Sequence, residues 1–173
     1  MYTTPDPKKE ARALLDRFWT GRPMPIDPAE IARMMGVVVL RTRLPENVAG
    51  VLVKKLGHDP RIVVQETDSE NRRRFTVAHE LGHFVQRGAS PEPDEAHYEY
   101  VDLRSTLSQT GTDQGEIFAN QFAAELLMPE SVVKAAAKKF GAATAALGAS
   151  FGVSQEAMSF RLRNLGLLPT ATR

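Results

Sequence analysis

Hydrophobic and polar residues recur in two different periods along this chain, which divides it into helical and extended parts. Residues 8–19 carry their apolar side chains at helical spacing, and Gly21-Arg22-Pro23 ends that segment. A second, short helix is predicted to begin at Asp27-Pro28-Ala29-Glu30, where Asp27 can cap the first turn and Glu30 can bond back to the cap. Gly36 closes it.

Three stretches rich in β-branched residues come next, at residues 37–44, 49–55 and 61–66. The segments between them, Pro45-Glu46-Asn47 and Gly57-His58-Asp59-Pro60, have the residues of turns. Because the connections are short, we expect a small three-stranded antiparallel sheet.

A long helix is predicted from Asp68 or Ser69 to residue 87, with Gly88 as its stop. Its buried stripe consists of Phe75, Ala78, Gly82 and Val85. Glycine inside a helix costs about 1 kcal/mol relative to alanine. We therefore expect another element to approach closely at Gly82.

The second half of the chain is predicted to be mainly helical. Residues 89–111 are polar, contain proline and show no period, which indicates a long loop. Asp113 can cap the next helix, with Glu116 in capping-box register, and Pro129 ends it. Further helices are expected at residues 130–140 and on both sides of Gly152-Val153-Ser154. The predicted fold class is α+β.

Composition narrows the possible chemistry. The chain has 173 residues, 42% of them hydrophobic and 25% charged, with a net charge of +1, which gives no general affinity for nucleic acid or anionic membranes. It contains no cysteine, so any metal must be bound through nitrogen and oxygen. The first ten residues are wrong for a secretory signal, and no apolar run is long enough to span a membrane. These features predict a cytoplasmic protein.

The run His79-Glu80-Leu81-Gly82-His83 carries the strongest chemical signal. On a helix, residues four apart share a face, so the two imidazoles can bind one divalent metal. Glu80 would then lie beside a metal-bound water and act as the general base. The competing interpretation is a coincidental or structural histidine pair, which the neighbouring strand and the later carboxylate helix disfavour.

Hydrolytic metal sites usually have three protein ligands. The remaining histidines, His58 and His97, fall in turn and loop segments, so we favour Glu116 as the third ligand. Asn120, one turn later, can orient a ligating histidine from outside the metal shell. Glu116 also has a purely structural interpretation, because an acidic side chain in the first turn stabilises a helix through its interaction with the helix dipole.

The metal and the oxyanion donor are less well defined by the sequence. Two imidazoles and a carboxylate suit zinc, while manganese or iron can occupy the same kind of site. His97, Tyr98 and Tyr100 are candidate donors to a developing oxyanion because of their chemistry and their place in the predicted loop.

Two segments resemble signatures of the ImmA/IrrE family of metallopeptidases. Residues 73–83, Arg-Arg-Phe-Thr-Val-Ala-His-Glu-Leu-Gly-His, resemble its active-site helix, and residues 116–129, Glu-Ile-Phe-Ala-Asn-Gln-Phe-Ala-Ala-Glu-Leu-Leu-Met-Pro, resemble its second signature. Weaker similarity extends from about residue 25 to residue 168.

This resemblance implies a zincin-like core, a small sheet with an active-site helix beneath it. It also implies that His79, His83 and Glu116 bind the metal and that Glu80 is catalytic. Relatives in the family cut a partner transcriptional repressor with a helix-turn-helix domain of the XRE type, which releases genes for stress response or mobile-element transfer. Others occur beside toxin–antitoxin systems.

We divide the chain into a metallopeptidase core at residues 1–141, with an N-terminal helix at 1–24, and a helix-turn-helix-like segment at residues 142–173. The second helix of that segment would expose Gln155, Ser159 and Arg163 but also Glu156. So few cations predict weak DNA binding or none. Alternatively, the helix pair packs on the core or docks the substrate protein.

Two further alternatives concern charge and catalysis. Arg72-Arg73-Arg74 is compatible with nucleic-acid binding, but a solvated helix side paired with Asp68 or Glu70 is the favoured interpretation. The protein can also be a repressor-binding or antitoxin-type protein with a metal site but no proteolysis, although the intact Glu80 argues against this.

For a peptidase, residues 61–66 are the expected sheet edge to which a substrate strand adds.

Overall fold

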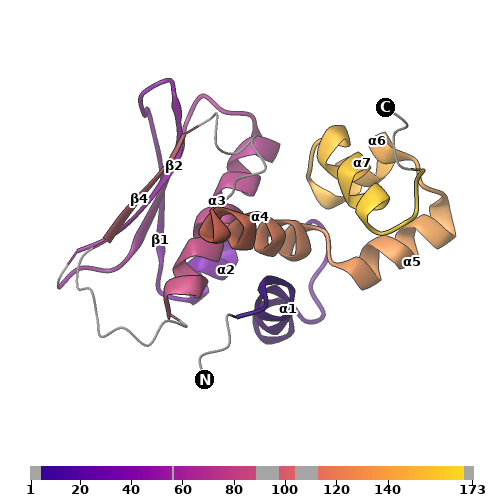
Figure 1. Cartoon of the computed structure of the whole chain (residues 1–173), viewed down its shortest axis with the longest axis horizontal. Coiled ribbons are helices and arrows are strands. Elements are labelled where there is room, and N and C mark those ends of the chain that lie inside the picture. The colour runs from indigo at the N-terminus through magenta and orange to yellow at the C-terminus, as the bar shows by residue number, and fades with distance from the viewer. Residues whose placement is uncertain (1–4, 56, 89–97, 104–112, 170–173) are drawn as a thin grey trace.

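The computed structural model describes residues 5–55, 57–88, 98–103 and 113–169 (Figure 1). Its elements follow the chain in this order: α1 (Pro7–Phe18), α2 (Pro28–Met34), β1 (Val38–Thr42), β2 (Val48–Lys54), β3 (Arg61–Gln65), α3 (Glu70–Gly88), β4 (Tyr98–Leu103), α4 (Gln114–Leu127), α5 (Glu130–Phe140), α6 (Thr144–Phe151) and α7 (Gln155–Asn164). The α+β class and the three predicted strands are confirmed.

The sheet is mixed and has four strands, in the order β1-β3-β2-β4. β2 is antiparallel to β3 and β4, but β1 is parallel to β3, so the expectation of a wholly antiparallel sheet is wrong. The reason is topological. Residues 43–47 reverse the chain between β1 and β2, and β3 then inserts between these two opposed strands, so it must run parallel to one of them.

Two further expectations about the sheet need correction. β4 lies within the segment predicted to be a loop, where it pairs with β2. β3, expected to be the edge that receives a substrate strand, is an interior strand with neighbours on both sides. Its backbone groups are already paired, so among the described strands the edges β1 and β4 are the ones that can accept a peptide.

The helices α2, α3 and α4 all lie on one side of the sheet, and α5, α6 and α7 form a group at the far end of the molecule (Figure 1). α3 packs against β2, β3 and α4. The hydrophobic core is continuous, since it includes Ile62 in β3, Leu81 in α3, Phe122 in α4 and Met158 in α7, each fully buried. Among the described residues, no helix has the length and apolar character needed to cross a membrane.

Aspartates begin two of the helices, as predicted. Asp27 accepts hydrogen bonds from the amides of Ala29 and Glu30, and Asp113 accepts one from Gly115. Glu30, expected to bond back to its cap, forms an ion pair with Arg22 instead, at 2.8 Å. A nearby guanidinium is therefore the partner of that carboxylate.

The arginine run at the start of α3 has mainly structural contacts. Arg73 donates to the backbone oxygens of Glu66 and Asp68, and Arg74 donates to those of Gly152 and Ile26. Burial lowers the pKa of Arg74, although it remains a cation. Arg73 and Arg74 thus bond to carbonyl oxygens, and Arg74 joins α3 to the turn between α6 and α7; the pairing of this run with Asp68 or Glu70 stays a prediction.

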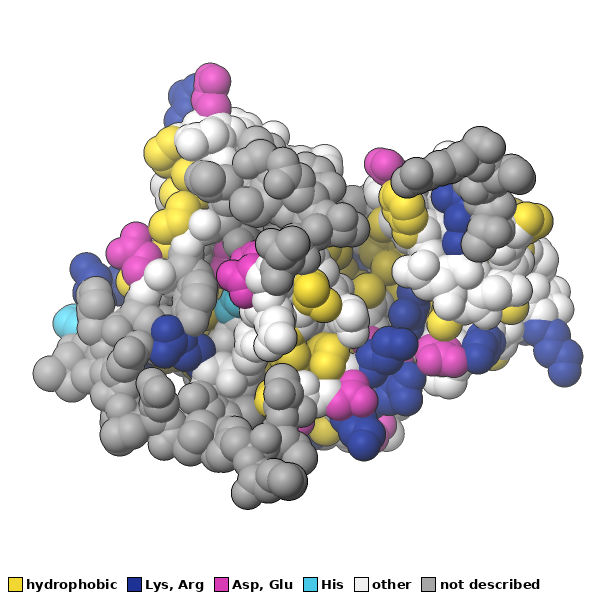
Figure 2. Space-filling model, in the orientation of Figure 1, with side chains coloured by type: hydrophobic (Ala, Val, Ile, Leu, Met, Phe, Trp, Pro, Cys, Tyr) yellow, Lys and Arg dark blue, Asp and Glu magenta, His cyan; other side chains and the backbone are white. Residues whose placement is uncertain are grey.

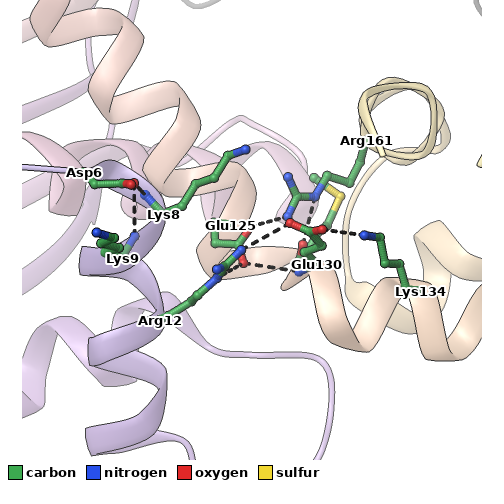
Figure 3. Close-up of polar contacts among 9 residues, drawn as sticks. Asp6, Lys8, Lys9, Arg12, Glu125, Glu130, Lys134 and Arg161 are labelled. Atoms are coloured by element: carbon green, nitrogen blue, oxygen red, sulfur yellow. Dashed lines mark hydrogen bonds and ion pairs between the residues drawn. The ribbon is translucent and has the colours of Figure 1, made fainter. Parts of the chain in front are cut away.

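A buried carboxylate connects the N-terminal, central and C-terminal helices (Figure 3). Glu125 of α4 is 1% exposed and accepts hydrogen bonds from Arg12 of α1, at 2.8 Å, and from Arg161 of α7. Arg161 also donates to the backbone oxygen of Met128, at 3.0 Å. Burial raises the pKa of Glu125, but the two arginine hydrogen bonds outweigh it and hold that pKa below its usual value.

We expect Glu125→Gln to lower the free energy of unfolding by roughly 3 kcal/mol, because it leaves the Arg161 guanidinium, 6% exposed, without its counter-charge. At about 2–4 °C per kcal/mol for a chain of this size, the melting temperature falls by about 6–12 °C. Thermal denaturation followed by circular dichroism measures the change. Glu130→Gln is the control, since that carboxylate makes exposed ion pairs with Arg12 and Lys134.

The ion pair between Glu125 and Arg161 makes the stability of the protein depend on pH. Because the folded pKa of Glu125 is lower than its unfolded value, near 4.5, the pair stabilises the protein above that value. This contribution is lost as the pH falls through the folded pKa. The difference in stability between wild type and Glu125→Gln should therefore shrink below about pH 4.5; a difference that is constant down to pH 3 contradicts the assignment.

Candidate metal centre

The predicted histidine pair lies on the buried face of α3. His79 is 0% exposed and His83 is 3% exposed. Because they are one helical turn apart, their rings converge, with the two Nε2 atoms 3.1 Å apart. The helix thus brings two nitrogen ligands to one point.

Glu116 reaches the same point from the first turn of α4. Its Oε2 lies 3.3 Å from His79 Nε2, and its Oε1 lies 3.2 Å from His83 Nε2. These two residues and Glu116 form the only group of three or more potential metal ligands within the described part of the chain. The Glu116 side chain is 21% exposed, but its Oε2, which faces His79, is buried.

The spacing of these atoms fits a small divalent cation. Zinc–nitrogen and zinc–oxygen bonds of about 2.0–2.2 Å at tetrahedral angles separate neighbouring ligand atoms by about 3.3–3.5 Å. The nearest separations in this group, 3.1, 3.2 and 3.3 Å, are close to that value, with each histidine facing a different oxygen of Glu116; with one ligand atom from each residue, all three atoms lie within 4.8 Å of one another. Two imidazoles and one carboxylate are also a donor set that leaves one tetrahedral position open.

Asn120 fixes the orientation of one histidine. Its Oδ1 lies 3.1 Å from His79 Nδ1, so that the Nδ1–H group donates to the amide oxygen. The His79 Nε2 lone pair is then directed at the ligand group. Asn120 is on the same face of α4 as Glu116, one turn later, as the sequence predicts.

We expect Asn120→Ala to weaken metal binding by about 10- to 100-fold without changing the stoichiometry, because His79 loses the contact that holds its tautomer and ring orientation. Competition with a chromogenic chelator measures the affinity. Gln121→Ala, at an exposed neighbouring position of α4, is the control and should bind metal as wild type does. Equal affinities for Asn120→Ala and wild type contradict an orienting role.

Gly82 explains how α4 comes so near to α3. A Cβ atom added at Gly82 would lie 2.9 Å from Ala119 Cα and 3.2 Å from the Phe122 ring. Such a contact with backbone cannot be relieved by rotating a side chain, so any larger residue would push the helices apart. The close approach expected from the sequence is confirmed, and it brings Glu116 within reach of the histidines.

Glu80 is fully buried and lies on the sheet side of α3. A Cβ added at Gly50 of β2 would be 2.9 Å from Glu80 Oε1 and 2.4 Å from the Thr76 methyl group. The carboxylate therefore lies directly against the backbone of β2. Gly50 was not predicted as a site residue, although glycine inside a strand is a known sign of close approach.

Among the remaining predicted residues, only the side chain of His58 belongs to the described part of the chain. His58 is in the turn after β2, where its backbone oxygen accepts from Lys54 Nζ at 2.5 Å. His97 lies outside the described residues. The backbones of Tyr98 and Tyr100 lie in β4, where they pair with Lys54 and Leu52. The assignment of His97, Tyr98 or Tyr100 as an oxyanion donor stays a prediction.

The helix pair predicted near the C-terminus is present. α6 is capped at its C-terminus by Gly152, which has a left-handed φ of 63°, and α7 is capped at its N-terminus by Ser154, whose side chain accepts from the Ala157 amide. A Cβ at Gly148 would lie 3.2 Å from the Val153 oxygen, which shows how tightly the turn packs. DNA binding by α7 and the division of the chain at residue 141 stay predictions.

Comparison with known families supports the geometry. The sequence model of the M78 peptidase family, described as the IrrE N-terminal-like domain, matches residues 32–163, about three quarters of the chain. The match includes both histidines, Glu80 and Glu116. None of the curated proteins matches the sequence.

Proposed function

Because this chain belongs to the M78 peptidase family of IrrE N-terminal-like domains, we propose that it is a metal-dependent endopeptidase, with zinc as the metal and Glu80 as the general base. The observation that carries the proposal is the convergence of His79, His83 and Glu116, with ligand atoms 3.1–3.3 Å apart. Glu80 lies between the two histidines on the same helix, and this position supports its proposed role as the general base.

In this mechanism His79, His83 and Glu116 hold the metal, and Asn120 keeps His79 in the required tautomer. A zinc ion held by these residues would supply Lewis acidity, the chemistry that lowers the pKa of water to about 7 and activates a carbonyl group. Glu80 accepts the proton of the attacking water on its carboxylate and passes it to the leaving amine. Burial of Glu80 against Gly50 fixes the position from which it does so.

We further propose that the substrate is a regulatory protein, most specifically a helix-turn-helix transcriptional repressor of the XRE type. The support is the resemblance of residues 73–83 and 116–129 to ImmA/IrrE signatures and the match to the family over residues 32–163. On this proposal, cleavage removes a repressor and so regulates transcription in response to stress. An extended segment of the repressor would pair with β1 or β4, the edge strands.

Cleavage of purified repressors tests this proposal. The protein is stripped with a chelator, reloaded with zinc or manganese, and incubated with the XRE-type repressor encoded nearest to it. Mass spectrometry should find two complementary fragments only in the reloaded samples. An intact repressor that nevertheless forms a complex with the metal-loaded protein would favour a binding role without proteolysis.

A further inference from the structure

One face of the sheet has no described helix or strand on it. The helices α2 and α3 pack on the other face, and α4 packs on α3 (Figure 1). On the uncovered side, hydrophobic side chains gather over the strands, with acidic and basic side chains beside them (Figure 2). We call this side the outer face, and its residues are Val38, Leu40, Val51, Val53, Arg61, Val63, Glu99 and Val101.

The strand register arranges these residues in two rows. Leu40 pairs with Val63, Val63 with Val51, and Val51 with Val101, so one apolar row crosses all four strands. Directly paired residues point to the same side of a sheet. Leu40 and Val101, at the two ends of the row, are 43% and 48% exposed.

The second row has charges at defined places. Val38 pairs with Arg61, Arg61 with Val53, and Val53 with Glu99. Arg61 on β3 and Glu99 on β4 are both exposed and lie on opposite sides of the central strand β2. Strands are spaced about 4.8 Å apart, so each charge is about 5 Å from the line of β2.

This arrangement is self-complementary. A two-fold axis along β2, between two copies packed face to face, places β2 over β2 and β3 over β4 of the second copy. Val51 then meets Val51, and Val63 meets Val101. Arg61 of each copy faces Glu99 of the other, so the contact contains two identical ion pairs, as a two-fold interface requires.

We propose that the outer face is a dimerisation surface and that its occupant is the outer face of a second copy of this chain. A second copy matches both the apolar row and the positions of the two charges through the two-fold axis, whereas a different protein would have to match each of them separately. Sheets packed in this way lie about 10 Å apart, a distance that arginine and glutamate side chains can bridge from opposite faces.

The area of the outer face limits the affinity of this dimer. Four strands with about five residues each give a flat area of roughly 300 Å². Stable interfaces bury about 800 Å² on each partner. The dimer should therefore be weak and depend on concentration.

Sedimentation equilibrium of the full-length protein tests the proposal. The weight-average mass should rise from 19.1 kDa toward twice that value. We expect this rise between about 1 and 500 µM, the range for a small interface. A mass that stays at 19.1 kDa throughout overturns the proposal.

Charge reversal identifies the face. Arg61→Glu places like charges opposite each other in a homodimer, and so does Glu99→Arg, so each variant alone should stay monomeric. A mixture of the two variants restores both ion pairs and should dimerise as wild type does. Lys138→Glu is the matched control, with the same charge change at an exposed position of α5, and should not affect association.

The mixture is also a control for folding, because only folded variants can restore the dimer when they are combined. If the wild type dimerises but the mixture does not, the contact uses another surface and the proposal fails. The test is independent of the metal centre, since no outer-face residue belongs to it. Loss of peptidase activity and loss of dimerisation are therefore distinguishable results.

Discussion

Glu80→Gln is expected to lower the cleavage rate by about 10²- to 10⁴-fold while metal binding is unchanged. The amide has nearly the shape of the carboxylate but cannot accept the proton of the attacking water. Glu80 is not one of the three convergent ligand residues, so the metal should remain. Single-turnover cleavage and metal analysis of the same preparation measure the two effects separately.

Glu70→Gln is the matched control for this variant. It makes the same chemical change at an exposed position near the start of α3 and should cleave at the wild-type rate. Cleavage by Glu80→Gln at that same rate would remove Glu80 from the role of general base, even if the metal centre is real.

His83→Ala is expected to lose both the metal and the activity. Removing one of three protein ligands leaves a pair that cannot hold the cation firmly. Wild-type protein should also gain stability from the metal, about 2.7 kcal/mol at a free concentration 100 times the dissociation constant. For a chain of this size that corresponds to a melting temperature about 5–11 °C higher, and His83→Ala should lose this increase.

The control for this second variant is His58→Ala. It removes an exposed histidine that is not part of the ligand group, so metal content and the metal-dependent melting shift should match wild type. A His83→Ala protein that keeps one equivalent of metal would show that the cation is bound elsewhere.

The features that the sequence predicted correctly are mostly local. Helical periodicity alone determines that His79 and His83 share a face, because residues four apart are neighbours on any α-helix. Likewise, aspartate caps act over two or three residues, so Asp27 and Asp113 could be read directly. Gly82 was also interpretable, since its helix cost requires a compensating contact.

The features that were missed depend on contacts between distant segments. The parallel pairing of β1 with β3 follows from where β3 inserts, which strand periodicity does not encode. β4 contains Tyr98-Glu99-Tyr100-Val101, but it lies within a polar, proline-bearing region, so the sequence favoured a loop there. The Glu125–Arg161 pair joins residues 36 positions apart and has no motif.

Glu116 shows how local and distant information combine. Its position in the first turn of α4 is equally consistent with a role in capping, and its spacing in the sequence does not decide between the two roles. The Gly82–Ala119 contact decides it, because this contact brings α4 close enough for the carboxylate to reach both Nε2 atoms. Asp113 makes the predicted cap, through the Gly115 amide.

Anomalous diffraction from crystals of the zinc-loaded protein tests the central claim most directly. A single strong peak is expected among His79 Nε2, His83 Nε2 and the Glu116 carboxylate, at one zinc ion per chain. A peak at any other group of residues, or fully loaded protein with no peak between α3 and α4, would contradict the account.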